Sequence, residues 1–563
     1  MVNLVNLLVA QKVIAKDAGE KLIRQAEQEA AAVHAQAVQT QVALAKVQAP
    51  GSAPTSVASA PSASSDDVQV NYVPEVVKNQ IRDEVTESVM KQTRDEKLAP
   101  SQDNIPEWVK RFHVAGDIRV RAEADFYPDD NAGGENFTNF NAINTGAPFN
   151  FGQNNPNFPP SYNVNQERDR LRLRARIGAG IDLGENFTAG IRVGTGSDDN
   201  PVSENQTLGA ANSSQGSNFG KYQIWLDRAF LRYEIGGETD KNFSLAIGRF
   251  DNPFFHTSMI WSDDLAFDGA VAQGKYAVAE GVTPFLVAGV FPVFNTDLNF
   301  STNQPTKFES EDKWLYAAQT GVNWAASKDI SFKVAAAYYY FADVEGKVSD
   351  PFIPQSASDA GNTDDSRPSF AQNGNTYIAL RDITPDASNN FGANNQFQYF
   401  GLATPFHEFA LTSQLDYGGF DPFHLWLTGE FVKNLAFDRA AIENNGPANA
   451  LGPQNNLVGG NFVGGDTGWI LRLSAGKVAL EHLWDWNVNL SYRYVESDAT
   501  VDGFVDSDFG GSLAGTNLKG FTIGGNLALS PRVWAGLRWM SADSVAGPTF
   551  KSDVIQFDIN AKF

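Results

Sequence analysis

The chain has 563 residues, so it is expected to form either several domains or one large closed sheet. Its 43 Lys and Arg against 66 Asp and Glu give a formal net charge of -23, which argues against nucleic acid as a partner. The chain has no Cys and no apolar run of about eighteen residues, so helical membrane spans are excluded. A transmembrane β-barrel stays open, because only alternate residues of its strands need be apolar.

No signal peptide is recognisable at the N-terminus. Residues 1–9 lack a basic region and a small-residue cleavage site, and Lys12 and Lys16 follow the apolar stretch. If the chain is exported, we expect its leader to have been removed from this sequence.

Residues 1–48 are rich in Ala, Gln and Val and contain no Pro, which predicts a helix. From residue 23 onward the apolar and small residues recur at steps of three and four, the a/d seam of a coiled coil. This seam consists of Ile23, Ala26, Ala30, Val33, Ala37, Thr40, Leu44 and Val47. An Ala-rich seam buries little surface in a lone helix, so self-association is favoured over a solvated helix.

Three further segments precede the remainder of the chain. Residues 49–68 form a Pro/Ala/Ser-rich linker. A second helix is expected within 69–98, beginning near Pro74, and residues 99–110 form a connector. The simplest alternative is two solvated helices on a flexible stalk. From residue 111 to residue 563 the periodicity is that of strands.

The clearest strand runs from Arg168 to Leu183, where apolar and charged residues alternate without a break. A strand places such sets on opposite faces, whereas a helix would scatter both around its axis. One face holds Leu171, Leu173, Ala175, Ile177, Ala179, Ile181 and Leu183, and the other holds Arg168, Arg170, Arg172, Arg174 and Arg176. In a barrel the apolar face meets lipid and the Arg face lines the lumen.

About sixteen strands are predicted, most of them long enough to cross a bilayer when tilted. They are expected near 112–126, 168–183, 186–196, 222–235, 243–250, 269–278, 282–291, 313–325, 329–341, 405–417, 422–434, 467–477, 486–497, 518–529, 532–542 and 552–563. Short connections alternate with long polar ones, which is the asymmetry of bacterial outer-membrane barrels. We therefore predict an all-β transmembrane fold, a closed antiparallel barrel with an N-terminal helical extension.

Aromatic residues near the strand ends, such as Trp314, Trp324 and Trp486, suit the interfacial girdles of a barrel. The last strand carries apolar residues on one face and stops at Phe563. A terminal aromatic residue in this position resembles the signal read by the outer-membrane assembly machinery.

Four stretches resemble the bacterial family called putative porins. They are VPEVVKNQIRDEV at 73–85, IPEWVKRFHVAGDIRVRAE at 105–123, WSDDLAFDGA at 261–270 and DATVDGFVDSDFGG at 498–511. The resemblance implies a porin in the outer membrane of a Gram-negative bacterium, in contact with lipid and lipopolysaccharide. We expect a water-filled channel for passive diffusion of ions and small hydrophilic solutes, with the N-terminal helices in the periplasm.

The strand count is also similar to that of the sixteen-stranded trimeric general porins, in which the loop after the fifth strand narrows the pore. Here that loop is 251–268, and it carries Asp263, Asp264 and Asp268. In such porins the acidic loop faces a basic wall. Alternation places nine Arg on the lumen side of the first four predicted strands: Arg119, Arg121, Arg170, Arg172, Arg174, Arg176, Arg192, Arg228 and Arg232.

Opposed rows of charge set up a strong transverse field, and Arg keeps its charge at any relevant pH. We therefore predict a charged constriction between the loop and the Arg wall. If the Arg wall dominates the field, anions should be moderately favoured. A plainer interpretation is that these Arg only stiffen the wall by pairing with Glu123, Asp125, Asp182 and Glu234.

No catalytic or metal-binding pattern stands out. The six His are scattered without ligand spacing, and neither a G-x-S-x-G elbow nor a phosphate loop is present. Acidic pairs at 129–130, 198–199 and 364–365 lie in long loops and are expected to be solvated, with divalent-cation binding as the alternative. No enzyme activity, metal or cofactor is expected.

Other functions remain open beside the diffusion porin. The barrel could anchor a structural tether whose N-terminal helices bind peptidoglycan, or it could be an anion- or phosphate-selective porin. A barrel enzyme would need a nucleophile or an acid pair beside a His. We expect a homotrimer, while the solute, the conductance and the ion preference cannot be read from the sequence.

Overall fold

The computed structural model describes residues 109, 111–210, 220–236, 241–296, 307–444 and 452–563. The helices predicted within 1–48 and 69–98 and the linker 49–68 lie outside these residues. So does the connector 99–110 apart from residue 109. No helix in the described part of the chain is long and apolar enough to cross a membrane.

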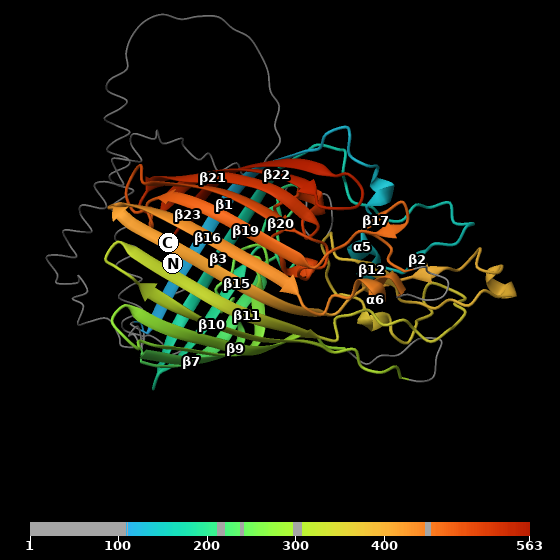
Figure 1. Ribbon diagram of the computed structural model, residues 1–563, viewed down its shortest axis with the longest axis horizontal. Helices are drawn as coiled ribbons and strands as arrows, with labels where there is room; N and C mark the ends of the chain where they lie inside the picture. The colour runs from blue at the N-terminus through green and yellow to red at the C-terminus, as the bar shows by residue number, and fades with distance from the viewer. Residues whose placement is uncertain (1–108, 110, 211–219, 237–240, 297–306, 445–451) are drawn as a thin grey trace, which may run out of the picture. The chain divides into compact units, whose positions relative to one another are not determined.

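Sixteen long strands form one closed antiparallel sheet within these described ranges (Figure 1). They are β1 (Phe112–Phe126), β3 (Arg168–Gly184), β4 (Phe187–Gly194), β6 (Trp225–Ile235), β7 (Lys241–Asp251), β8 (Ala266–Tyr276), β9 (Val282–Phe294), β10 (Lys313–Ala325), β11 (Ile330–Ala342), β15 (Phe406–Phe420), β16 (Phe423–Asn434), β19 (Thr467–Gly476), β20 (Trp486–Val495), β21 (Leu518–Ser530), β22 (Val533–Ser544) and β23 (Lys551–Lys562). All sixteen predicted strands are confirmed, with ends that differ by at most three residues.

Closure depends on β1, which pairs with β3 on one side and with β23 on the other. The pairing extends to the last residue, because the backbone N–H groups of Gly116 and Phe563 each donate to the other residue's carbonyl over 3.0 Å. A side chain at position 116 would collide with the Phe563 ring, since a Cβ atom there would lie 2.6 Å from Cζ. Gly116 therefore leaves room for the terminal aromatic ring.

The two faces of β3 are as predicted. Leu171 and Ile177 are 57% and 49% exposed on the outer surface. The side chains of Arg172 and Arg174 are only 12% and 14% exposed and form ion pairs inside the barrel. Exposed apolar side chains recur at every second position on other strands, including Leu245 and Ile247. The barrel thus presents an apolar outer face and a charged inner one.

Short turns join the strands at one end of the barrel, and the long connections gather at the other (Figure 1). The long connections carry the remaining elements: α5 (Phe140–Asn144), α6 (Arg439–Asn444), β2 (Phe149–Asn150), β5 (Gln206–Thr207), β12 (Tyr377–Ala379), β13 (Phe397–Gln398), β14 (Phe400–Leu402), β17 (Leu457–Val458), β18 (Asn461–Phe462) and the 3-10 turns Gly134–Asn136, Asp364–Ser366, Ala387–Asn389, Asp502–Phe504 and Gly511–Leu513. They pack against one another through buried aromatic rings, such as Phe140 stacked on Tyr377 at 4.6 Å.

The lipid-facing assignment predicts a large penalty for charge in the middle of β3. Replacing Ile177 by Arg should destabilise the barrel by about 2–4 kcal/mol, because the guanidinium would have to enter hydrocarbon. Urea unfolding from lipid vesicles, followed by Trp fluorescence, measures the change. The matched control is Val458→Arg, at a side chain 53% exposed in the hairpin of β17 and β18, with an expected change within about 0.5 kcal/mol. Equal losses for both variants would contradict the assignment.

Candidate functional site

Residues 252–265 connect β7 to β8 and run through the barrel interior; we call them the inner segment. Phe255 N–H donates to the side-chain oxygen of Gln319 on β10, and the Gln319 amide donates back to the Phe255 carbonyl, both over 2.8 Å. Further along, Thr257 donates from its backbone and its hydroxyl to the buried carboxyl of Glu430 on β16. The inner segment is thereby held against strands far from its own.

The middle of the inner segment is apolar and fills one side of the lumen. Met259, Ile260 and Trp261 are at most 2% exposed. The Trp261 ring packs edge-on against Phe267 at 5.0 Å and Tyr339 at 5.2 Å. The lumen is therefore filled around Trp261.

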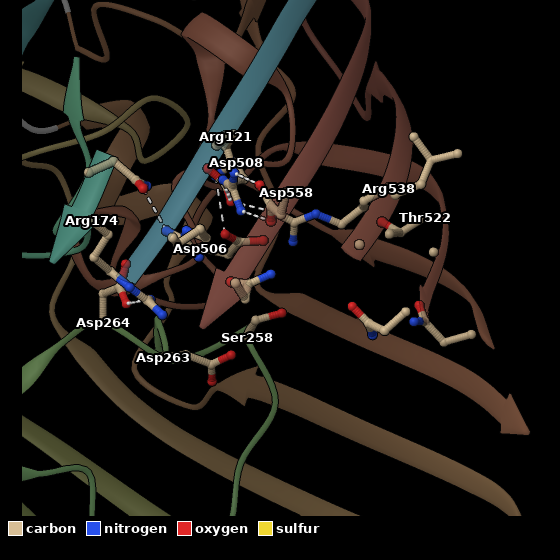
Figure 2. A pocket seen from close by; sticks show the side chains of 18 of the residues that line it. Arg121, Arg174, Ser258, Asp263, Asp264, Asp506, Asp508, Thr522, Arg538 and Asp558 are labelled. Atoms are coloured by element: carbon tan, nitrogen blue, oxygen red, sulfur yellow. Dashed lines mark hydrogen bonds and ion pairs between the residues drawn. The ribbon is translucent and has the colours of Figure 1, made fainter. Parts of the chain in front are cut away.

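A long loop from the other side of the barrel, residues 496–517, meets the inner segment. Ser262 N–H donates to the Phe504 carbonyl over 2.8 Å, and Asp506 N–H donates to the Ser258 carbonyl over 3.1 Å. The two loops therefore form one unit inside the barrel, and their acidic residues face the same space (Figure 2).

The Arg side chains of β1 and β3 all point inward. Arg121, only 2% exposed, donates two hydrogen bonds to Asp558 on β23 and one of 2.8 Å to Asp508. Arg174 lies 3.0 Å from both Asp117 and Asp264, so it links the wall to the inner segment. The remaining pairs are Arg170 with Glu123 and Asp125, Arg172 with Glu123, and Arg176 with Asp117 and Glu204, while Arg119 donates to the amide oxygen of Asn205.

The predicted Arg of β4 and β6 divide into two groups. Arg192 and Arg228 both pair with Asp227 and Asp251, at the point where β7 ends. Arg232 lies apart from them, with its guanidinium carbon 5.3 Å from the Phe230 ring centre. The wall-stiffening partners Glu123 and Asp125 are found in the predicted pairs. Asp182 instead accepts from the Gly184 backbone, and Glu234 accepts from Asn242.

The three predicted acids of the loop do not stay together. Asp263 and Asp264 line the open space beside the Arg wall, and Asp264 pairs with Arg174. Asp268 lies on β8 itself, because that strand begins at Ala266, and it pairs with Arg249 over 2.6 Å. The structure thus places Asp268 apart from Asp263 and Asp264.

The open space is a polar cavity of about 570 Å³ between the inner segment and the inward faces of β1, β3 and β19 to β23 (Figure 2). Six Arg and five Asp line it: Arg119, Arg121, Arg174, Arg176, Arg472, Arg538, Asp263, Asp264, Asp506, Asp508 and Asp558. With opposite charges in nearly equal number, the cavity carries a strong local field but little net charge.

Five of these eleven charged residues were not among the predicted ones: Arg472, Arg538, Asp506, Asp508 and Asp558. Arg472 and Arg538 lie between outward apolar residues on β19 and β22, so the alternation used for β3 identifies them too. Asp506 and Asp508 had no such signal, because they belong to a loop whose path no local pattern predicts. Within the described residues no group of three or more His, Asp or Glu side chains is arranged to hold a metal ion.

The two loop acids differ electrostatically. Burial raises the pKa of the Asp508 carboxyl, but the neighbouring Arg121 and Arg538 lower it more, so the pKa lies well below its usual range. Burial and the adjacent Asp508 raise the pKa of Asp506. Asp508 is therefore a fixed negative charge on the rim of the cavity.

A closed antiparallel barrel with an apolar outer face, a charged interior and an inward loop defines an outer-membrane channel. The profile of the family described as "Putative porin" matches residues 1–563, so the chain belongs to that family and is an outer-membrane porin channel. This confirms the resemblance seen in the sequence. No curated protein matches the chain.

Several solved structures are similar to this chain. The outer membrane channel DcaP of Acinetobacter baumannii has 8% identity and a TM-score of 0.36, covering 80% of this chain and 97% of its own. OprB of Pseudomonas putida has 10% identity and a TM-score of 0.39, covering 81% and 95%. An anion-selective porin from Comamonas acidovorans has 11% identity and a TM-score of 0.35, covering 80% and 99%.

The anchoring of the inner segment predicts a change in channel behaviour when its hydroxyl contact is removed. Thr257→Val should weaken the attachment to Glu430 by about 1–3 kcal/mol, because a buried carboxyl loses one of its donors. We expect larger fluctuations of the open-channel current in single-channel recordings. Thr320→Val, the same change at an exposed position on β10, is the control. Equally steady currents for both variants would show that this hydroxyl does not anchor the segment.

Proposed function

We propose that the channel is a passive pathway for ions and small hydrophilic solutes, with its constriction between the inner segment and the Arg wall of β1 and β3. The observation that carries the proposal is the ion pair of Arg174 and Asp264, which joins wall and segment beside the polar cavity. A solute at this point exchanges bulk water for contacts with fixed charges of both signs.

We infer a moderate anion preference from the way these charges are paired. Asp117, Glu123, Asp508 and Asp558 neutralise most of the Arg wall. Within the described part of the chain, Arg119 and Arg472 line the cavity without a carboxylate in ion-pair distance. Among the described carboxylates that line the cavity, only Asp263 opposes them without a basic partner of its own. The unpaired side chains therefore give the cavity a small net positive charge.

We also propose a homotrimer with the N-terminal helices in the periplasm. The supporting observations are the a/d seam between Ile23 and Val47 and the strand number shared with trimeric general porins. Helices in the periplasm would be placed to contact peptidoglycan, although diffusion through the channel does not depend on that contact.

Ion selectivity should respond in opposite directions to the two sides of the constriction. Replacing Arg172 and Arg174 by Ala leaves Glu123, Asp117 and Asp264 less compensated, so the anion-to-cation permeability ratio should fall. Replacing Asp263 and Asp264 by Ala should raise it. Reversal potentials across a planar bilayer in a salt gradient measure both changes.

A matched control is the replacement of Asp129 and Asp130 by Ala, at exposed positions of a long loop. Screening acts over roughly 8 Å at physiological salt, so these distant charges should leave the reversal potential nearly unchanged. If neither constriction pair shifts the potential, the constriction lies elsewhere in the barrel.

Oligomeric state provides a separate test. Light scattering in mild detergent at neutral pH should give a protein mass of three chains of 61.2 kDa. A variant with Val33→Asp and Leu44→Asp places charge on the helical seam and tests whether the helices contribute to assembly. A monomeric unsubstituted protein would contradict the trimer. A variant that remains fully trimeric would assign assembly to the barrel alone.

A further inference from the structure

A second cavity also borders the inner segment, and its charges are not balanced. It measures about 570 Å³, and Pro253, Phe254, Phe255 and His256 of the inner segment form one side of it. The other sides are inward-facing residues of β6 to β11, chiefly Arg232, Glu234, Asn242, Ser244, Gln273, Lys275, Phe285, Gln319, Asn323 and Lys333. We call it the basic recess.

Three cations of the basic recess stand without carboxylate partners. Among the described residues, no Asp or Glu lies within ion-pair distance of Arg232, Lys275 or Lys333. The buried Nε of Arg232 has no hydrogen-bond acceptor. The one carboxylate in the lining, Glu234, accepts a hydrogen bond of 2.7 Å from Asn242. This differs from the Arg wall, where Asp and Glu contact almost every guanidinium.

Uncompensated cations in a partly enclosed space are electrostatically costly, since each has lost part of its hydration. An anion that enters the recess supplies the counter-charge that these cations lack. The charge of the recess therefore selects for a negatively charged occupant.

Aromatic rings border the same cations. Lys333 Nζ lies 4.1 Å from the centre of the Phe255 ring and 5.4 Å from that of Phe285. A cation over a ring keeps its charge and its N–H donors available to an anion. The rings give the recess apolar surface next to its positive charge, which suits a flat apolar group joined to a carboxylate.

The basic recess lies toward one end of the barrel. Its lining residues on β6, β8, β10 and β11 lie in the halves of those strands that lead to the short turns. It borders the start of the inner segment, residues 253–256, whereas the polar cavity borders Ser258, Ser262, Asp263 and Asp264. The two cavities share no lining residue, so a solute bound in the recess contacts none of the residues that line the polar cavity.

We propose that the basic recess is a binding site for aromatic carboxylates, with the carboxylate held by Arg232, Lys275 and Lys333 and the ring against Phe255 and Phe285. The proposal extends the proposed function by naming a solute class that the channel binds, and it rests on that function only for its biological role.

Benzoate is the probe, and its binding to the full chain in mild detergent is measured by equilibrium dialysis. Binding should be saturable. Benzyl alcohol, which has the ring without the charge, should not compete, and acetate should compete about tenfold more weakly than benzoate. Replacing Lys275 and Lys333 by Gln should weaken benzoate binding about tenfold or more, because two charge-assisted contacts are lost.

The matched control is Lys328→Gln, which removes a Lys whose side chain is 89% exposed in the turn before β11. It should bind benzoate like the unsubstituted protein. Phe255→Leu keeps every charge and should weaken benzoate binding while leaving acetate binding unchanged. The single variant Lys333→Gln removes one of the two charges and should weaken benzoate binding less than the double variant does, which gives a second test if the double variant does not fold.

The outcomes separate the two proposals. Saturable benzoate binding that depends on Lys275, Lys333 and Phe255 supports the recess, whatever the reversal potential shows. Equal competition by acetate or phosphate, with no effect of Phe255→Leu, would reduce the recess to a general anion site and overturn the aromatic specificity. If the protein conducts in bilayers but does not bind benzoate, the proposed role of the basic recess is wrong and the proposed channel function is unaffected.

Discussion

A chain that crosses hydrocarbon as strands has to hydrogen-bond every backbone N–H and C=O group within itself, and a sheet achieves this only by closing. In this protein β1 supplies the closure through its pairing with both β3 and β23, which continues to Gly116 and Phe563 at the end of the chain. Once the sheet is closed, each strand has one face toward lipid and one toward the lumen. The alternation that identifies the strands is a consequence of that closure.

Closure also brings like charges together inside the barrel. Arg119 lies opposite Arg174, and Arg121 lies opposite Arg172, across the β1–β3 pair. Like charges in directly opposed positions repel, so this wall needs carboxylates from elsewhere. Asp558 of β23 supplies one, and the two loops supply Asp264 and Asp508. The same contacts that neutralise the wall hold the inner segment and the loop 496–517 inside the lumen. The contacts that shape the pore are therefore the same contacts that neutralise the charge of its Arg wall.

The fold was predictable because its signal is local. Alternation alone located sixteen strands to within three residues, and the order of strands placed the inner segment after the fifth. Contacts between segments that are far apart in the sequence could not be predicted from local alternation. Asp268 was assigned to the loop because nothing local shows that β8 begins at Ala266. Asp508 reaches Arg121 and Arg538 from a loop far from either strand, and no periodicity encodes that path. The helical segments before residue 109 remain predictions.

Paired and unpaired charges act differently on a solute. The paired rows at the polar cavity give a transverse field that orients a passing dipole, yet their contributions to the mean potential nearly cancel. In the basic recess Arg232, Lys275 and Lys333 add to one another, so the potential there attracts anions without a compensating row. The formal charge of -23 decides neither effect, because screening over roughly 8 Å leaves a solute in the lumen sensitive only to its nearest charges. An acidic protein can therefore have an interior that favours anions.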